Sequence, residues 1–411
     1  MSAPLDGLSV LDISEGIPGP FCAKLLGDLG ADVVKVERPG RGDASRSLPS
    51  DGAVPATNGS SPDGTPGGGG HPGATSGTFF FMNTSKRGVT LDLDGERGRE
   101  LLGGLLPQYD IVVAGETERE LAARGLGYGQ LQRWHPSVIL TTISGFGSEG
   151  PHAGYRWSHL IACAVGGWSN NCGVPDREPL QAGGAIAESL AGAFAAAGTL
   201  IAALGRTAHG GGDHVDVSAQ EAAIAAALFP SLVYEYRGVV GERNSHVGPG
   251  PSFILPTTDG HVGVNVLTGP QWDLLCQFFG RPDMVDDPRF QPPQRHLHAN
   301  DARDAFTAAM ADRTADDVFH DGQTWRVPFG LVLGMEAVSD FLPHQEREFL
   351  VELDSPSGGA VTVPGVPFQS TAPAPTVGPP PEIGEHNEHV FRELLGLSEG
   401  EIAELSREGV I

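Results

Sequence analysis

The sequence predicts an α/β protein, with a mainly parallel sheet in a large domain and a smaller α+β domain within the chain. Three observations support this fold class. Strand and helix patterns alternate from residue 8 to residue 217, as in parallel sheets that helices cover on both faces. The alternation changes over residues 230–330, where shorter elements follow. The chain has 411 residues, which is enough to form two domains.

A strand–helix–strand unit opens the chain. Residues 8–13 have the apolar pattern of a strand, and the Gly and Pro residues at 16–20 end it. Residues 21–29 then predict a helix and residues 31–37 a second parallel strand, reached by a right-handed crossover. Glu37 stands where dinucleotide-binding enzymes place a ribose-binding acid, but the turn before the helix lacks G-x-G-x-x-G. The sequence therefore does not favour a nicotinamide-dependent oxidoreductase.

Two further segments have a distinctive composition. Residues 47–77 are rich in Gly, Pro and Ser, so we expect a flexible surface insertion in the large domain. The Ala-rich segment 184–204 predicts a long buried helix, with one face formed by large apolar residues: Ile186, Leu190, Phe194 and Ile201. We expect that face to lie in the core. Glu188 falls on the opposite face, next to Gly192 and Ala195.

The remaining elements follow from the same periodicities. Strands are expected at 109–113, 138–144, 214–217 and 260–266, and helices or helical turns at 101–106, 271–279, 391–394 and 399–407. Ser218 and Glu221 have the spacing of a capping box, so a helix should begin at Ser218 and run towards Leu228. Residues 331–380 are rich in Pro and predict an extended chain.

Composition and charge exclude several classes of protein. The net charge of −25 repels nucleic acid and anionic lipid, so we expect neither as a partner. The chain has no run of 18 apolar residues and no signal peptide at its first residues, so we expect no membrane span and a cytoplasmic location. The four cysteines are scattered, which favours reduced thiols and no metal site: Cys22, Cys163, Cys172 and Cys276.

Basic residues are concentrated near one end of this acidic chain. All three lysines lie in the first ninety residues, together with four arginines: Lys24, Lys35, Lys86, Arg38, Arg41, Arg46 and Arg87. Such a concentration predicts an anion-binding site. The alternative is ordinary surface charge.

Several short segments, in this order, carry a family resemblance. They read PLDGLSVLD at 4–12, LGADVVKVERPG at 29–40, NTSKRGVTLDL at 83–93, SGFG at 144–147, HVDVS at 214–218, GRP at 280–282 and DPRF at 287–290. Together they resemble the family III CoA-transferases, the group of carnitine dehydratase, bile-acid-inducible protein F and α-methylacyl-CoA racemase. The resemblance extends over nearly the whole chain.

The resemblance implies a fold, a substrate and a binding site. The fold is a Rossmann-like large domain from residues 1–229 and the return segment 331–411, with a small α+β domain at 230–330. Two such subunits form an interlocked homodimer, or one pairs with a homologous subunit. The substrate is an acyl-CoA, so coenzyme A is the implied ligand and no metal is expected. By position, six residues would face the nucleotide and phosphates of CoA: Val36, Glu37, Arg38, Asn83, Lys86 and Arg87.

The chain departs from the family at the reaction centre. The transferases begin an apolar helix with an Asp that carries the acyl group as a mixed anhydride, and His159 stands at that position here. The racemases pair a His with a carboxylate on the next helix, which corresponds to His159 and Glu188. They also place a Glu in the small domain, and residues 266–271 contain none. A further CoA-facing segment is altered and more acidic at residues 114–119.

Three functions remain open. We favour proton transfer on an acyl-CoA by His159 and Glu188, as in a racemase, isomerase or dehydratase, because an imidazole moves protons near neutral pH but cannot replace the Asp as an anhydride carrier. The second is a CoA-transferase that moves CoA between a thioester and a carboxylic acid through another nucleophile, such as Glu188. The third is a non-catalytic subunit that pairs with an active homologue. No motif marks the acyl group.

Overall fold

The described chain divides into two compact units. The structure, a computed structural model, describes residues 3–48, 76–173, 176–238, 240, 243, 251–292, 294–355, 359–371 and 376–411. Unit 1 comprises residues 1–169, 181–226 and 347–411, and unit 2 comprises residues 170–180 and 227–346. The main boundaries between the units thus lie after residues 226 and 346, whereas the sequence suggested boundaries after residues 229 and 330. Residues 170–180 had not been assigned to the second domain.

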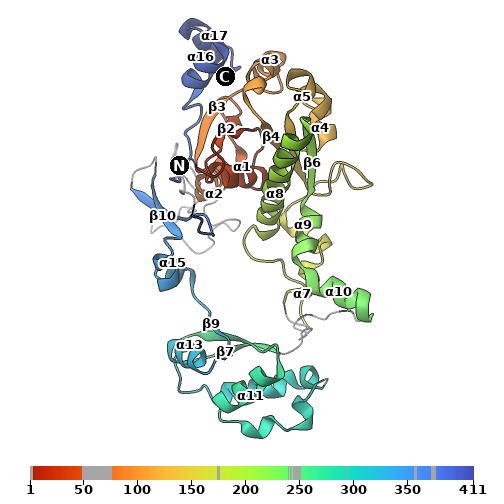
Figure 1. Ribbon diagram of the computed structural model, residues 1–411, viewed down its shortest axis with the longest axis vertical. Coiled ribbons are helices and arrows are strands. Elements are labelled where there is room, and N and C mark those ends of the chain that lie inside the picture. Colours follow the sequence, from red (N-terminus) through yellow and green to blue (C-terminus); the bar gives the residue numbers. More distant parts are fainter. Residues whose placement is uncertain are drawn as a thin grey trace, which may run out of the picture. The chain divides into compact units, whose positions relative to one another are not determined.

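A six-stranded parallel sheet forms the centre of unit 1 (Figure 1). Its strands, in spatial order, are β3 (Lys86–Thr90), β2 (Asp32–Glu37), β1 (Ser9–Asp12), β4 (Ile111–Ala114), β5 (Ile139–Ser144) and β6 (Asp213–Ser218). Every neighbouring pair is parallel. This architecture confirms the predicted α/β class. From β1 the chain adds β2 and then β3 on one side of the sheet, and from β4 it adds β5 and then β6 on the other side. The order in which strands are added therefore reverses between β1 and β4.

Helices cover both faces of the sheet because successive strand residues point to opposite sides. On β4, Ile111 and Val113 belong to one apolar core, while Val112 belongs to the other. The unit 1 helices are α1 (Pro18–Gly27), α2 (Gly77–Met82), α3 (Glu96–Leu105), α4 (Glu118–Ala123), α5 (Tyr128–Trp134), α6 (His159–Val165), α8 (Ile186–His209), α9 (Ala219–Ala226), α16 (Asn387–Leu395) and α17 (Glu399–Arg407). Helices α16 and α17 supply Phe391 and Leu405 to the same core as Val112, so residues from both ends of the chain complete one unit.

Helix α8 packs on α1 through small residues, which corrects one prediction. Its buried residues include Ala191, Gly192 and Ala195, whereas the large side chains of Phe194 and Ile201 are 45% and 69% exposed. A Cβ on Gly192 would lie 2.5 Å from the Pro18 carbonyl oxygen, so the two backbones approach too closely for a larger residue. The predicted apolar face therefore points outward from unit 1 and the small-residue face is buried.

Helix α8 also meets a membrane-span criterion. Among the described residues it is the one helix long and apolar enough to cross a membrane by length and composition. Helices of soluble cores meet the same criterion, and this one contacts α1, α9 and β6 within unit 1.

The Pro-rich region after residue 331 is not wholly extended, contrary to expectation. It contains α14 (Met335–Val338), α15 (Leu342–Glu346) and an antiparallel hairpin of β10 (Leu350–Asp354) and β11 (Ala360–Pro364). Leu353 and Val363 pack against Phe80, and this apolar contact orders the hairpin. Most of the insertion predicted at 47–77 lies outside the described residues. At its two edges, η1 (Ala44–Ser47) ends and Ser76 caps α2.

Unit 2 is a small α+β assembly. Its sheet has the order β7 (Ser252–Pro256), β8 (His261–Asn265) and β9 (Phe329–Leu331), with both pairs antiparallel. Its helices are α10 (Leu228–Arg237), α11 (Gly269–Phe278), α12 (Ala299–Ala308) and α13 (Ala315–Thr324), with short turns η3 (Pro282–Met284), η4 (Pro288–Phe290) and η5 (Arg295–His298). Trp272 and Phe306 lie fully buried at the centre of its core. The remaining short helices are η2 (Leu106–Gln108) and α7 (Trp168–Asn171).

Candidate functional site

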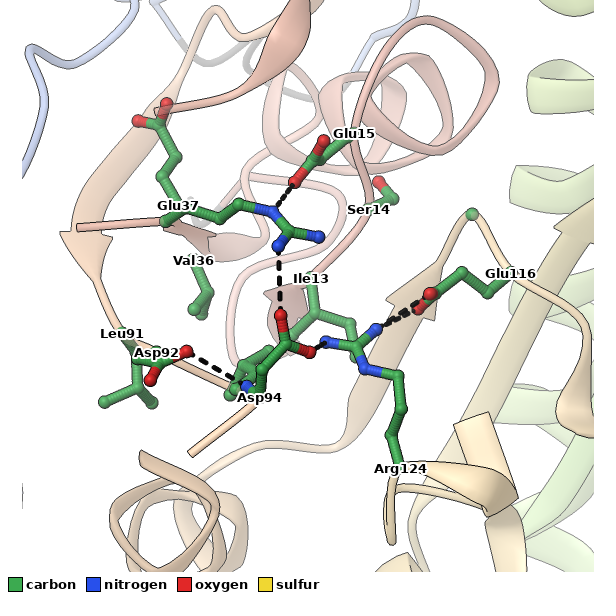
Figure 2. A pocket seen from close by; sticks show the side chains of 13 residues that line it. Ile13, Ser14, Glu15, Val36, Glu37, Leu91, Asp92, Asp94, Glu116 and Arg124 are labelled. Carbon is green, nitrogen blue, oxygen red and sulfur yellow. Dashed lines mark hydrogen bonds and ion pairs between the residues drawn. The ribbon is translucent and has the colours of Figure 1, made fainter. Parts of the chain in front are cut away.

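A pocket lies at the carboxyl edge of the parallel sheet (Figure 2). Residues that follow four strands line it: Ile13, Ser14 and Glu15 after β1, Val36, Glu37 and Arg38 at the end of β2, Leu91, Asp92, Leu93 and Asp94 after β3, and Gly115 and Glu116 after β4, together with Arg124. It encloses about 150 Å³. Because the strand order reverses between β1 and β4, this is the position where open parallel sheets bind their ligands.

Two arginines cross the pocket and share one carboxylate. Arg38 donates from Nε to Glu15 over 2.7 Å and from a terminal nitrogen to Asp94 over 3.0 Å. Arg124 pairs with Glu116 at 2.6 Å and with the other oxygen of Asp94 at 3.0 Å. Figure 2 shows the Arg124 guanidinium between the carboxylates of Asp94 and Glu116. Hydrogen bonding to Glu15 raises the pKa of Arg38.

The residues proposed to face CoA fall into two groups. Val36, Glu37 and Arg38 line the pocket, whereas Asn83, Lys86 and Arg87 do not. The Glu37 carboxylate forms a bidentate pair with Arg46, with both distances 2.7 Å. Its negative charge is therefore already matched beneath the pocket wall.

Lys86 belongs to a buried charge network near the pocket. Its ammonium group donates to Asp12 at 2.8 Å, to the Pro20 carbonyl at 2.9 Å and to Asn83 at 2.8 Å, and its side chain has no exposed surface. Burial lowers the pKa of Lys86 to about 8, although Asp12 acts in the opposite direction. Such an enclosed ammonium supports the structure around the end of β1.

Lys35 completes this network from β2. It pairs with Asp43 at 2.7 Å and lies 3.7 Å from Asp12. Burial alone would lower the pKa of Lys35, but the two carboxylates outweigh it and raise that pKa. Lys35 also donates to the Ser14 carbonyl and so holds the loop that forms one wall of the pocket. Arg87 points elsewhere, since it pairs with Asp32 at the start of β2.

His159 begins α6, which Ser158 caps by accepting from the backbone of Ile161. The Nε2 atom of His159 lies 2.9 Å from the Ala182 carbonyl oxygen. Because a carbonyl only accepts, Nε2 carries the proton and Nδ1 is the nitrogen that accepts one in the neutral ring. The buried thiol of Cys163, one turn further along α6, lies 3.8 Å from Nδ1.

Glu188 lies in the first turn of α8 and is half-buried. Burial raises the pKa of Glu188, and the nearby His159 partly offsets this rise. The structure thus brings the two candidate catalytic residues close enough for their charges to interact. A carboxyl group of raised pKa beside an imidazole can exchange protons, and in its ionised form it can act as a nucleophile.

Of the pocket residues, the sequence analysis proposed Val36, Glu37 and Arg38, and its altered CoA-facing segment 114–119 contains Gly115 and Glu116. It did not single out the other eight: Ile13, Ser14, Glu15, Leu91, Asp92, Leu93, Asp94 and Arg124. Ser14 and Glu15 follow a predicted strand, and that position could have identified them. Asp94 follows β3, a strand that was not predicted, and Arg124 ends the short helix α4. Only the folded chain brings these two together.

Comparisons with known proteins agree with one another. The profile of CoA-transferase family III matches residues 5–387. Succinyl-CoA–D-citramalate CoA-transferase of Chloroflexus aurantiacus is 33% identical over 99% of this chain and 98% of its own. Succinyl-CoA:glutarate CoA-transferase of Mus musculus is 26% identical over 99% of this chain and 90% of its own, and formyl-CoA:oxalate CoA-transferase of Rhodopseudomonas palustris is 28% identical over 100% and 98%.

Solved structures share the fold. A CAIB/BAIF family protein from Brucella suis is 25% identical with a TM-score of 0.81, covering 96% of this chain and all of its own. The protein Rv3272 from Mycobacterium tuberculosis is 26% identical with a TM-score of 0.78, covering 95% of this chain and 99% of its own.

Proposed function

The chain belongs to CoA-transferase family III, and from this membership we propose that it transfers CoA between an acyl-CoA and a free dicarboxylic acid, with Glu188 as the carboxylate that carries the acyl group. The observation that carries this proposal is a half-buried carboxyl group beside His159, in a chain that matches CoA-transferases from end to end. Three relatives are named for citramalate, glutarate and oxalate, all dicarboxylic acids, which supports this acceptor class.

Covalent catalysis by Glu188 proceeds in balanced steps. The Glu188 carboxylate adds to the thioester carbonyl, the C–S bond breaks, CoA leaves as a thiolate, and the acyl group remains on Glu188 as a mixed anhydride. The thiolate then attacks the glutamyl carbonyl, which releases the first acid and leaves a glutamyl thioester. The second acid attacks this thioester to form a new anhydride, and the thiolate takes the new acyl group from Glu188. The charge on a protonated His159 favours the ionised carboxylate.

Proton transfer is the second candidate, because a specific observation favours it. With its Nε2 proton on the Ala182 carbonyl, His159 presents Nδ1 as a base, and Glu188 with its raised pKa is matched to return a proton. Such a pair can remove and replace the α-proton of an acyl-CoA, and positioned general acid–base groups contribute about 10²–10⁴-fold each. This is the reaction that the sequence favoured. We favour CoA transfer over proton transfer because the relatives are named as CoA-transferases.

The nucleotide end of the substrate belongs, in this proposal, to the pocket at the carboxyl edge. The planar Arg38 guanidinium can stack on an adenine, and Val36 supplies an apolar wall. Lys86 acts from beneath by holding Asp12 at the end of β1, and Asn83 accepts a hydrogen bond from Lys86.

A homodimer explains the exposed apolar residues of unit 1. Phe194, Ile201 and Leu204 of α8 are 45%, 69% and 74% exposed, and Leu160 and Val165 of α6 are also exposed. A second copy of the chain would cover such a surface. The proposal is therefore a homodimer, interlocked as the family resemblance implies.

One experiment separates the candidate reactions. The protein is incubated with succinyl-CoA, a labelled dicarboxylic acid and D₂O. CoA transfer predicts a labelled thioester without deuterium at the α-carbon, and hydroxylamine trapping of a hydroxamate at Glu188. Deuterium uptake without transfer would instead establish proton transfer. Neither activity across a panel of acyl-CoA thioesters would favour the partner-subunit function. Glu221→Gln, in the first turn of α9, is the matched control.

A further inference from the structure

The charge balance of the carboxyl-edge pocket is unusual for a site that receives a phosphorylated nucleotide. Its lining contains five carboxylates, Glu15, Glu37, Asp92, Asp94 and Glu116, against two guanidinium groups, Arg38 and Arg124. No lysine lines it. The pocket is therefore negative before any ligand enters.

Both arginines are already paired with carboxylates. Arg124 binds both oxygens of Glu116 at 2.6 and 2.8 Å and also reaches Asp94, while Arg38 lies between Asp94 and Glu15. One buried donor, Nε of Arg124, has no hydrogen-bond partner among the described residues. Of the other two carboxylates, Glu37 is paired with Arg46 and Asp92 accepts from the backbone of Asp94. A phosphate dianion entering the pocket would have to displace a carboxylate from an arginine and then lie beside that carboxylate.

An arginine can bind a nucleotide in two ways, by stacking its plane on the base and by pairing its charge with a phosphate. An arginine paired with carboxylates can still stack on a nucleobase, but the carboxylates already neutralise its charge. Sites that select a phosphorylated ribose instead offer an uncommitted arginine, whereas acidic side chains accept hydrogen bonds from free ribose hydroxyl groups. The lining of this pocket resembles the second kind of site.

We propose that the pocket recognises the adenosine end of the thioester without a counterion for the ribose 3′-phosphate, so that the protein binds 3′-dephospho-CoA at least as tightly as CoA. This inference rests on the proposed function, since it takes the pocket as the nucleotide site. Glu116 and Asp94 are the residues that set this preference, because they occupy Arg124 and Arg38.

Calorimetry on the intact protein tests the proposal with two ligands, CoA and 3′-dephospho-CoA. For the unaltered chain we expect the dissociation constant of CoA to equal or exceed that of the dephospho form. Glu116→Gln keeps the shape of the side chain but removes one of the two carboxylates that pair with Arg124, so CoA should gain about fivefold relative to dephospho-CoA, as expected for one partly exposed charge pair. Asp94→Asn should act in the same direction through both arginines.

The matched control is Glu100→Gln on α3, which removes the partner of Arg97 in an exposed pair outside the pocket and should leave the ratio unchanged. A preference of tenfold or more for CoA in the unaltered protein would overturn the inference and leave the proposed function intact. The same ratio in Glu116→Gln, Asp94→Asn and the unaltered protein would also overturn it. Binding of neither ligand would overturn both this inference and the nucleotide site of the proposed function.

Discussion

Single side chains define the chemistry that this chain can perform. His159 and Glu188 come from two helices, and burial raises the pKa of the Glu188 carboxyl group while the nearby imidazole partly offsets this rise. The backbone carbonyl of Ala182 fixes which imidazole nitrogen carries the proton. The pair is thus suited to either of two reactions, and substitutions distinguish them.

Replacing His159 by Asp should install the carboxylate that transferases of the family carry at this position. Glu188→Gln alone should reduce CoA transfer by at least about 10²-fold, since it removes the proposed nucleophile. In the double variant His159→Asp/Glu188→Gln, transfer should return to within about tenfold of the original rate. Transfer is measured by chromatography of the product thioester. Undiminished transfer in Glu188→Gln would refute the proposed role of this residue.

Lys86 predicts a distinctive pH dependence of stability. Its folded-state pKa of about 8 lies below the ordinary value of 10.5, so between these pH values the unfolded chain binds more protons at this residue. The contribution of Lys86 to the free energy of unfolding should therefore rise with pH from about 8 to 10, by roughly 1–2 kcal/mol. Cys22 and Cys276, whose pKa burial raises from 9.0 to about 12, contribute in the opposite direction above pH 9. Above pH 10 Tyr109, whose pKa burial raises to about 12, acts in the opposite direction.

Urea unfolding of the protein and of Lys86→Met at several pH values checks this expectation. The free energy of unfolding of the original chain minus that of the variant should increase by this amount between pH 8 and 10, because both proteins contain the same two thiols. Equal slopes in the two proteins would show that Lys86 stays protonated throughout this range.

Among the elements, α8 shows how small residues determine packing. The face of α8 formed by alanine and glycine lies on α1. There the backbones come close together, and dispersion contacts between backbone atoms take the place of contacts between large side chains. The larger residues of the same helix remain exposed on unit 1. This arrangement makes Gly192 the least replaceable position of the helix.

Gly192→Ala should destabilise the protein by about 1–3 kcal/mol, because the added methyl group would lie 2.5 Å from the Pro18 carbonyl and backbone cannot yield cheaply. Gly129→Ala in α5 is the control, since nothing lies within 4 Å of its Cβ position. There the loss of glycine flexibility should stabilise the helix by about 0.5–1 kcal/mol. Thermal unfolding measures both. A neutral Gly192→Ala would mean that α1 and α8 can separate slightly without penalty.

Most strands and helices could be predicted because their apolar periodicity is strong. The strand predicted at 31–37 is β2, and the helix predicted at 184–204 is α8. β3 escaped prediction because its sequence, KRGVT, begins with two charged residues and a glycine. The prediction of which face of α8 is buried was wrong, because periodicity identifies a helix face without showing whether its small or its large residues form the contact within the chain.

The candidate site was only partly predictable. His159 and Glu188 could be singled out by position and residue type, and the structure places them near each other. The pairing of Arg38 and Arg124 through Asp94 could not be foreseen, because it joins the ends of β2, β3 and α4. Long-range ion pairs leave no local pattern in a sequence.

For the whole molecule, the exposed apolar surface of unit 1 predicts association. Mass photometry at nanomolar concentration should give twice the chain mass of 42.8 kDa, and dilution should not release monomer if the subunits are interlocked. Ile201→Ser together with Leu204→Ser should lower the yield of dimer, because both side chains are largely exposed on unit 1. Monomeric mass for the unaltered chain would refute the proposal. Tyr236→Ser, an exposed substitution on unit 2, is the comparison.

Helices α16 and α17 have a consequence for the life of the protein in the cell. They cover a core whose strands were made near the start of the chain, so a nascent polypeptide emerges with Val112 and Leu102 lacking their cover until translation is almost complete. Chaperones should therefore stay bound to the growing chain for most of its synthesis. A chain truncated before residue 387 would expose the same apolar surface permanently and become a substrate for proteolytic quality control.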